Sequence, residues 1–355
     1  MRFLISMGIS VVVFFAALPA WSAVKNSKQT ERKTPPTLQE VEECVKAKAV
    51  LLVDAATNKV LFEKNTDMPL PPASTVKLMT ALLTYEKLGL NGSIIVSRQD
   101  TKVEPSNIPL RTGERVSVSD MMHTLLIGSD NDSALALARK TAGSEGKFVD
   151  MMNLRAQQLG CKNTIFANPH GLPDPKHQLT TAHDLLMIFQ KVLAIPALRE
   201  IAQTKEFWLR TRVGLQRVKN HNKLLGKYPG MGPAKTGWTL ASKHTYAASA
   251  TRNGRELHLI LLGSPDKWTD ARLLFDYGFS HSIDEKTDAI TAQTPSAPAP
   301  QKNSQPVSYT VRSGDTLSNI GKKYQCSTGE IIRYNQLKNP HQLMPGQILM
   351  IPVQN

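Results

Sequence analysis

The sequence predicts an α+β fold in which strands from the two ends of a large domain share one antiparallel sheet. Turn residues between β-rich runs indicate hairpins at residues 50–63 and 245–262, and the second contains Asn253-Gly254, the dipeptide most typical of tight hairpins. Strands at both ends of a domain with helices between them are typical of this class. Between the hairpins, apolar residues recur at helical spacing over residues 75–88, 118–142 and 182–192.

Length and composition indicate a globular protein of about two domains with an anionic partner. Hydrophobic residues make up 41% of the 355 positions and charged residues 20%, which excludes wholesale disorder and a multi-span membrane protein. The formal net charge of +14 predicts nucleic acid, an acidic membrane face or an acidic polymer as partner. The 3 cysteines are too few for a disulfide scaffold.

Residues 1–23 are predicted to be a secretory signal peptide. Arg2 precedes an uncharged stretch over residues 3–18, and small residues around Ser22 and Ala23 offer two cleavage positions. The apolar stretch is shorter than the roughly 20 residues of a spanning helix, so an uncleaved anchor is the weaker alternative. We therefore expect an exported protein with no transmembrane anchor after cleavage and no nucleic-acid partner.

Composition also divides the rest of the chain. Residues 24–40 are polar and basic and are expected to form a flexible N-terminal segment. Residues 284–307 are rich in Pro, Ala, Ser and Gln, which is typical of an extended linker. This linker separates a large domain at residues 41–283 from a small domain at residues 308–353.

The first chemical motif is Ser74-x-x-Lys77. Pro71 and Pro72 disfavour an earlier helix start, so Ser74 is expected at a helix N-terminus, where the helix dipole favours developing negative charge. Lys77 lies one turn along on the same face and can act as a base when burial lowers its pKa. The alternative is an N-capping serine beside a solvated lysine.

The second motif is Ser129-Asp130-Asn131, and it interrupts an apolar helical pattern. Buried polar groups are costly without partners, so we expect a loop between two helices that presents Ser129 and Asn131 to a cleft. The alternative is an ordinary turn capped by Asp132.

The third motif is Lys235-Thr236-Gly237, which comes just before the second hairpin and is therefore expected on a neighbouring strand. Gly237 has no side chain, which would let a ligand lie along this strand. Lys235 can bind a carboxylate as a point charge. The alternative is a surface turn.

In this order, the motifs form the catalytic set shared by class A β-lactamases and penicillin-binding proteins. Residues 41–282 resemble the serine D-alanyl-D-alanine carboxypeptidases, the low-molecular-mass penicillin-binding proteins, and a further family-like segment is Asn168-Pro169-His170-Gly171-Leu172. The resemblance implies a penicillin-binding-protein/β-lactamase-like domain with an antiparallel sheet and a helical subdomain. It also implies a periplasmic or wall-associated location.

The resemblance further implies acyl transfer. Ser74 would attack the bond between the last two D-alanines of a peptidoglycan stem peptide, Lys77 would accept its proton, and Ser129 would relay a proton to the leaving group. No cofactor or metal is implied, and β-lactam antibiotics would acylate Ser74 as covalent inhibitors.

The resemblance implies substrate binding for five further residues. Asn131 would orient the substrate amide, and Lys235 and Thr236 would bind the terminal carboxylate. Gly237 and Trp238 would line the site, and the backbone N–H groups of Ser74 and Trp238 would form the oxyanion hole.

Departures from the family patterns bear on the choice of activity and on the fine structure of the substrate. Asp130 matches the β-lactamase spelling, but residues 168–172 contain no water-activating Glu, which favours a peptidase over a β-lactamase. Residues 241–244 replace a small Ala-Gly pair that is common in the family. His170 is expected to stabilise its loop, since this mechanism needs no imidazole.

The tail resembles a LysM domain, with a β-α-α-β pattern over residues 308–353. LysM domains bind N-acetylglucosamine chains, and here the domain would replace the C-terminal membrane-anchoring helix of many relatives. The implied groove lies between two turns, formed by Ser313, Gly314, Asp315, Thr316 and Leu317 and by Leu343, Met344, Pro345 and Gly346.

The leading hypothesis is thus a secreted carboxypeptidase held on peptidoglycan. A D,D-endopeptidase that cleaves crosslinks, a β-lactamase and a catalytically silent wall-binding protein are the alternatives.

Overall fold

The computed structural model describes residues 34–103, 108–174 and 178–281, and in the tail residues 307–312, 315–324, 331, 334–335, 343–344 and 346–351. The chain divides into two compact units, Met1–Ser282 and Ile283–Asn355. The predicted signal peptide and nearly all of the predicted linker lie outside the described residues, so both stay predictions. In the described part of the chain, no helix is both long and apolar enough to cross a membrane.

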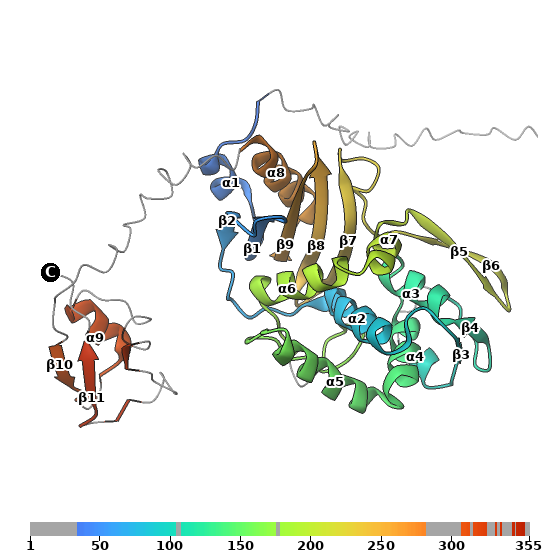
Figure 1. Ribbon diagram of the computed structural model, residues 1–355, viewed down its shortest axis with the longest axis horizontal. Helices are drawn as coiled ribbons and strands as arrows, with labels where there is room; N and C mark the ends of the chain where they lie inside the picture. The colour runs from blue at the N-terminus through green and yellow to red at the C-terminus, as the bar shows by residue number, and fades with distance from the viewer. Residues whose placement is uncertain are drawn as a thin grey trace, which may run out of the picture. The chain divides into compact units, whose positions relative to one another are not determined.

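The elements of the first unit (Figure 1) are α1 Leu38–Cys44, β1 Ala49–Asp54, β2 Val60–Lys64, η1 Ala73–Val76, α2 Lys77–Leu88, β3 Ser93–Ile95, η2 Asp100–Lys102, β4 Arg115–Ser117, α3 Val118–Leu126, α4 Asn131–Ala142, α5 Glu145–Gln158, α6 Ala182–Leu193, α7 Pro196–Gln203, β5 Glu206–Thr211, β6 Gly214–Lys219, β7 Met231–Thr239, β8 Lys243–Arg252, β9 Arg255–Ser264 and α8 Lys267–Ser280.

The main sheet has five antiparallel strands in the order β2-β1-β9-β8-β7. Both predicted hairpins are confirmed, as β1–β2 and β8–β9. The strand that opens the domain pairs with one that closes it, since Ala49 of β1 lies opposite Leu262 of β9. The predicted sharing of one sheet by the two ends of the domain is therefore also confirmed, and β7 is left as an edge strand.

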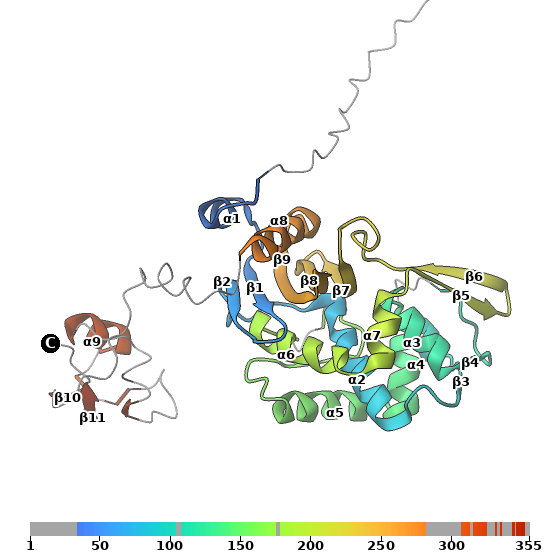
Figure 2. The ribbon, with the colours of Figure 1, turned by 45° about the horizontal axis from the view of Figure 1, so that its top comes forward.

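Alternation along the strands divides the apolar residues between two cores. On β1, Leu51 belongs to the core shared with the helical region, whereas Leu52 belongs to the core beneath α8. Figure 2 shows α8 and α1 on one face of the sheet and α6 and α2 on the other. Because both faces are covered, β1 is buried along its whole length and reads as a continuous apolar run.

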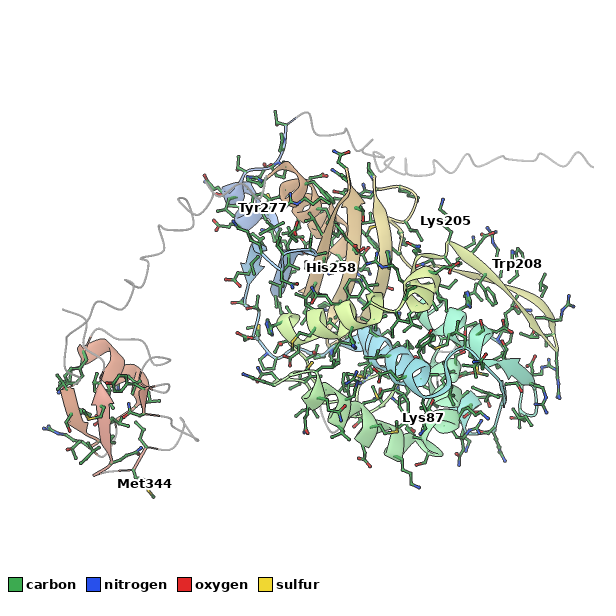
Figure 3. All side chains as sticks on the ribbon, in the orientation of Figure 1. Lys87, Lys205, Trp208, His258, Tyr277 and Met344 are labelled. Carbon is green, nitrogen blue, oxygen red and sulfur yellow. The ribbon has the colours of Figure 1, made fainter. Side chains whose placement is uncertain are left out.

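Two labelled side chains mark the two faces (Figure 3). His258 of β9 packs edge-on against Phe189 of α6, with ring centroids 5.6 Å apart. Tyr277 of α8 packs edge-on against Phe62 of β2 at 6.5 Å. Aromatic contacts thus fix a helix to the sheet on each side.

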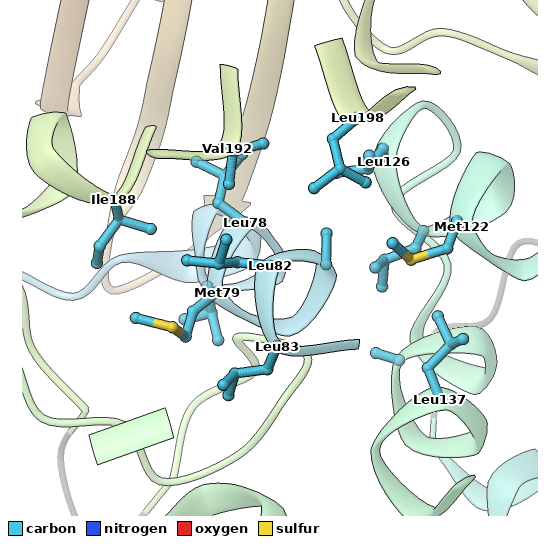
Figure 4. Packing of buried hydrophobic residues seen from close by; sticks show 14 of the residues in the cluster. Leu78, Met79, Leu82, Leu83, Met122, Leu126, Leu137, Ile188, Val192 and Leu198 are labelled. Carbon is cyan, nitrogen blue, oxygen red and sulfur yellow. The ribbon is translucent and has the colours of Figure 1, made fainter. Parts of the chain in front are cut away.

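Helix α2 lies at the centre of the helical region (Figure 4). Its buried face is made of Leu78, Met79, Leu82 and Leu83. Helices α3, α4, α6 and α7 surround it with Met122, Leu126, Leu137, Ile188, Val192 and Leu198. Because α2 is fixed on several sides, the turn that precedes it is held in one position.

Several elements differ from the sequence prediction. Helix α1 begins at Leu38, inside the segment expected to be flexible, because Thr37 caps it through the Glu40 N–H and Val41 is buried. The single helical pattern over residues 118–142 is two helices, α3 and α4, separated as expected by the Ser129 motif. The small β3–β4 and β5–β6 sheets carry no pattern that predicted them.

The second unit contains β10 Val307–Thr310, α9 Leu317–Tyr324 and β11 Ile348–Ile351, and the two strands pair antiparallel. Ile331 and Tyr334 are helical, where a second short helix was predicted. A small core includes Val311, Ile320 and Leu349.

Candidate active site

Ser74 lies in η1, the short 3-10 turn that leads into α2. The expected position at the start of a helix is therefore modified, since α2 itself begins at Lys77. Ala73 has a φ of 48°, in the left-handed region that non-glycine residues rarely adopt. Such strain persists only where surrounding contacts enforce it, and it is concentrated at functional sites.

Two glycines let the backbone close around this turn. A Cβ at Gly171, whose φ is 90°, would lie 2.1 Å from the Ala73 carbonyl oxygen. A Cβ at Gly237 would lie 2.8 Å from the Ser74 nitrogen and 2.3 Å from the Thr245 hydroxyl. Gly237 was expected to make room for a ligand, but the space beside it is filled by the turn that carries Ser74.

Lys77 is buried directly beneath Ser74. Its Nζ lies 3.2 Å from Ser74 Oγ, 2.7 Å from Asn131 Oδ1 and 2.5 Å from the His170 carbonyl oxygen. Burial lowers the pKa of Lys77 to about 7, against an opposing effect of the Asp130 carboxylate. An amine with this pKa is in part neutral near pH 7, as a base must be.

The loop over residues 168–172 is held by its own polar groups. Asn168 Oδ1 accepts hydrogen bonds from the Gly171 N–H at 2.7 Å and from Gln178 Nε2 at 3.1 Å. The His170 ring accepts one from the Leu172 N–H at 3.2 Å, and burial lowers the pKa of His170 to about 3, with Lys77 contributing. The imidazole is therefore neutral and placed as a loop contact.

Ser129 and Lys235 form a second hydrogen-bonded pair, which joins the α3–α4 loop to β7. Lys235 Nζ donates to Ser129 Oγ at 2.8 Å, and both side chains are buried. Burial, with nearby Lys77 and Lys267, lowers the pKa of Lys235 well below its ordinary value. Ser129 has a φ of 58° just before α4 begins. The N-cap of α4 is Asp130, which accepts from the Ser133 N–H at 2.8 Å, rather than Asp132 as the alternative proposed.

Strand β7 presents the third motif at the free edge of the main sheet. Thr236 is buried beside Lys235, whereas 57% of Trp238 is exposed. Successive residues of a strand face opposite sides, and Gly237 faces η1. The Trp238 ring therefore lies on the face away from η1, with its centroid 6.5 Å from that of His244. The Trp238 side chain therefore does not face Ser74.

Two basic residues near the site carried no motif that predicted them. The His221 N–H donates to the Ile127 carbonyl at 3.0 Å, and burial with Lys235, Lys267 and Lys77 lowers the pKa of His221 to about 4. Lys267 lies 2.8 Å from His244 Nδ1, and burial lowers its pKa to about 8. Only three-dimensional proximity identifies them, because they come from a loop and from α8.

No cluster of His, Cys, Asp and Glu within the described ranges is arranged to hold a metal ion.

In the tail, Val311, which precedes the first of the two turns expected to form the glycan groove, is hydrogen-bonded to the end of the second. The Val311 N–H donates to Gln347, and its carbonyl accepts from Gly346, both at 2.8 Å. Asp315 accepts from the Arg312 N–H at 2.7 Å, and Thr316 Oγ1 accepts from the Asn319 N–H at 3.2 Å.

Exposure differs among the remaining groove residues. Leu317 is buried, Leu343 packs against the small core and Met344 is exposed (Figure 3). Ser313, Gly314 and Pro345 lie outside the described residues.

Comparison with known proteins identifies both units. A family model described as D-alanyl-D-alanine carboxypeptidase matches residues 34–266, and a LysM domain model matches residues 309–352. The D-alanyl-D-alanine carboxypeptidase DacF of Bacillus subtilis is 31% identical over 78% of this chain and 75% of its own length. A D-alanyl-D-alanine endopeptidase of Pseudomonas aeruginosa is 29% identical over 74% of this chain and 84% of its own length.

A solved structure agrees with these matches. The D-alanyl-D-alanine carboxypeptidase of Mycobacterium tuberculosis H37Rv covers 68% of this chain and 93% of its own, with 31% identity and a TM-score of 0.65. The predicted family and the penicillin-binding-protein-like α+β fold are confirmed. The chain belongs to the D-alanyl-D-alanine carboxypeptidase family of serine hydrolases, and it carries a LysM domain near its C-terminal end.

Proposed function

We propose that this protein is an exported D,D-carboxypeptidase that removes the terminal D-alanine from peptidoglycan stem pentapeptides through an acyl-enzyme on Ser74. The observation that carries the proposal is the environment of Lys77. Its buried amine lies 3.2 Å from the Ser74 hydroxyl and has a pKa of about 7. A serine hydroxyl is a weak nucleophile that needs such an adjacent base.

In the acylation step, neutral Lys77 accepts the hydroxyl proton while Ser74 Oγ bonds to the carbonyl carbon of the penultimate D-alanine. The backbone N–H groups of Ser74 and Trp238 would donate to the oxyanion, which is a large contribution in acyl transfer. The C–N bond then breaks, and the proton reaches the leaving amine through Ser129, whose hydroxyl lies beside Lys235. Water next attacks the ester, which releases the shortened peptide and returns the proton to Ser74.

Substrate binding follows from the free edge of β7. An extended peptide can pair with an exposed strand edge through backbone hydrogen bonds. Its terminal carboxylate would lie at Lys235 and Thr236, and Asn131, whose Oδ1 lies 2.7 Å from Lys77 Nζ, would orient both the amide and the base. A β-lactam offers a similar carbonyl and carboxylate, so penicillins should acylate Ser74.

The tail supplies retention on the wall in this proposal. LysM domains recognise N-acetylglucosamine chains. The residues proposed to form the groove are Asp315, Thr316, Leu317, Leu343, Met344 and Gly346, and the sequence adds Ser313, Gly314 and Pro345. In this proposal the anionic cell envelope is the partner that the net charge of +14 predicts. The protein would reach it by export, with removal of residues 1–23.

A D,D-endopeptidase is the second candidate, favoured by the relatives that carry this name, such as the one from Pseudomonas aeruginosa. Both activities use the same acyl-enzyme and differ only in whether D-alanine or a crosslinked peptide leaves. A β-lactamase is disfavoured, because the loop over residues 168–172 contains no carboxylate to activate water.

Digestion of purified muropeptides distinguishes these activities. The full chain should convert pentapeptide monomers to tetrapeptides, with a loss of one alanine by mass spectrometry, while crosslinked dimers stay intact. Release of monomers from dimers at a comparable rate would instead establish the endopeptidase. Ser74→Ala is the control and should show neither product.

A further inference from the structure

The β5–β6 hairpin carries a surface that the proposed catalytic site and the LysM domain leave unused. Strands β5 and β6 project from the body beyond β7 and α3 (Figures 1 and 2). Between Lys205 and Lys219, the sequence has five basic side chains and one acidic side chain. This segment is therefore strongly cationic.

One face of the hairpin holds it against the body. Phe207 stacks on His123 of α3 with ring centroids 4.3 Å apart, and Leu209 and Val218 are buried. At the tip, the Arg212 N–H donates to Glu114 at 2.6 Å, and its guanidinium donates to the Gly113 carbonyl at 2.8 Å. The hairpin is thus a fixed arm whose opposite face is free.

We call that opposite face the outer face, and the register determines its members. It is made of the pairs Glu206–Lys219, Trp208–Arg217 and Arg210–Leu215. Half of Trp208 and 54% of Leu215 are exposed, and Figure 3 shows Trp208 pointing outward. Arg217 forms an ion pair with Glu206 and lies 5.8 Å from the centre of the Trp208 ring.

The outer face alternates apolar and cationic groups. Trp208 lies opposite Arg217, and Leu215 lies opposite Arg210, so neither strand carries a continuous apolar stripe. A membrane-surface anchor gathers its apolar side chains, and this tip is bonded to the body through Arg212. A polymer of sugar rings with attached peptides that carry carboxylates fits the pattern better, since aromatic rings bind apolar sugar faces and arginine binds carboxylates.

The base of the hairpin joins the candidate active site. The Asn220 N–H donates to the Lys205 carbonyl at 2.9 Å, and the next residue, His221, is bonded to Ile127 just before the Ser129 loop. Val218 also closes on Gly128, where a Cβ would lie 2.6 Å from its side chain. A chain bound along the hairpin would therefore lead toward Ser129.

We propose that the outer face of the β5–β6 hairpin binds a glycan strand of peptidoglycan together with the carboxylates of its stem peptides, and aligns these peptides with the active site. The inference rests on the proposed function, because it assumes that peptidoglycan is the substrate. It assigns the hairpin a role in polymer recognition that is separate from the LysM domain and from the groups that bind D-Ala-D-Ala.

The test compares two double variants of the full chain. The hairpin variant is Trp208→Ala with Arg210→Gln, and the matched control is Lys87→Gln with Leu154→Ala, which removes one exposed cation and one exposed apolar side chain elsewhere (Figure 3 labels Lys87). The substrates are soluble uncrosslinked glycan strands bearing pentapeptides and a small peptide ending in D-Ala-D-Ala.

For the hairpin variant, KM for the glycan strands should rise about tenfold, while kcat/KM for the small peptide stays that of the wild type. The wild type should also lose more affinity for the strands as salt increases. An unchanged KM for the strands, or an equal rise in the control, overturns the proposal.

Two further measurements keep the inference separate from the proposed function. If the wild type hydrolyses neither substrate, the proposed function fails, and fluorescence anisotropy with labelled glycan strands still shows whether the hairpin variant binds them more weakly. Vesicles of phosphatidylglycerol test whether the hairpin binds a membrane surface instead of a glycan strand. Loss of vesicle binding in the hairpin variant, with unchanged affinity for glycan strands, would assign the hairpin to the membrane and overturn the proposal.

Discussion

At the scale of single residues, the buried amine of Lys77 decides which chemistry is available to Ser74. Its pKa is lowered to about 7 because the charged form is buried, and its contacts are Ser74 Oγ, Asn131 Oδ1 and the His170 carbonyl. A solvated lysine, the alternative that the sequence left open, has a pKa of about 10.4 and would stay charged near neutral pH. The serine is therefore placed beside a group that can accept its proton.

The first prediction concerns pH. A base must be unprotonated, and lowering the pH through the Lys77 pKa of about 7 protonates it. We expect kcat/KM for a peptide ending in D-Ala-D-Ala to fall about tenfold per pH unit below this value. Initial rates from pH 5 to about pH 9, with stability checked at each pH, measure the profile; a rate that is constant through pH 6 would exclude Lys77 as the base.

The second prediction separates the charge of Lys77 from its role as a base. Lys77→Arg keeps a positive charge, but its guanidinium stays protonated at every accessible pH. Acylation by a fluorescent penicillin should slow by about 100-fold or more. Lys87→Arg, at an exposed position on the same helix, is the control and should label as the wild type does.

The third prediction concerns the closure of the backbone around Ser74. Gly171→Ala adds a methyl group 2.1 Å from the Ala73 carbonyl at a φ of 90°, whereas Gly143→Ala, at a φ of 85°, meets no atom within 4 Å. Both substitutions should cost about 1 kcal/mol of unfolding free energy for the backbone conformation. Only Gly171→Ala should cost roughly 2 kcal/mol more and lose penicillin labelling. Urea denaturation of both variants measures the difference. Equal losses of unfolding free energy would show that the close approach of Gly171 to Ala73 does not affect stability.

At the scale of secondary-structure elements, the site lies where η1, the α3–α4 loop and the edge strand β7 meet. Asp130 links helix α4 to the proposed proton relay, because it caps α4 and directly follows Ser129. Its Oδ2 accepts from the Ser133 N–H and from the Ser133 hydroxyl, both at 2.8 Å. The cap thus fixes the backbone that presents the Ser129 hydroxyl to Lys235.

The fourth prediction compares two helix caps. Asp130→Ala and Ser144→Ala each remove the side chain that caps a helix, α4 and α5 respectively. Each should cost about 1 kcal/mol of unfolding free energy. Only Asp130→Ala should lower kcat for the small peptide, because Ser129 loses its position. Equal kinetics in the two variants would show that the α4 cap has no part in catalysis.

At this scale, the sequence predicted the elements that have strong local patterns. The alternating strands, the Asn253-Gly254 turn and the apolar periodicity around Leu78 and Leu82 are all local signals. The hairpin β5–β6 was not predicted, because its outer strand positions carry Trp and Arg and its register depends on contacts with α3. Helix α1 was not predicted either, since Val41 is its one buried side chain and the helix packs against α8, which is distant in the sequence.

The same distinction holds for the site. The motifs identified Ser74, Lys77, Ser129 and Lys235 as a set, because the family preserves their order along the chain. Two features depend on how distant segments meet. One is the contact of the His170 carbonyl with Lys77, and the other is the close packing of Gly237 against Ser74, which leaves no room for a side chain. The sequence implied a role only for the backbone N–H of Trp238, and the pleat of β7 shows that its ring faces the other way.

At the scale of the whole molecule, the catalytic domain and the LysM domain are separate compact units with separate cores. Such a division lets one unit bind the wall polymer and the other act on its peptides. Linking two binding units raises the effective concentration of the second site once the first is bound.

The fifth prediction follows from this division. Deletion of residues 308–355 should remove most of the sedimentation with insoluble peptidoglycan, because the LysM groove is lost and only the binding proposed for the β5–β6 hairpin remains. Hydrolysis of the small peptide should stay within about twofold of the full chain, since the catalytic core is complete without the tail. Sedimentation that the deletion leaves unchanged would contradict a role for LysM in wall retention.

Ser74 is the proposed nucleophile of an acyl-transfer enzyme, and this claim can be tested directly. The most direct measurement is intact-protein mass spectrometry after brief incubation with benzylpenicillin, followed by peptide mapping. We expect the protein mass to increase by one penicilloyl group, carried by the peptide that contains Ser74, and we expect Ser74→Ala to remain unmodified. Adduct formation on another residue, or a folded wild type that acquires no adduct, would contradict the claim.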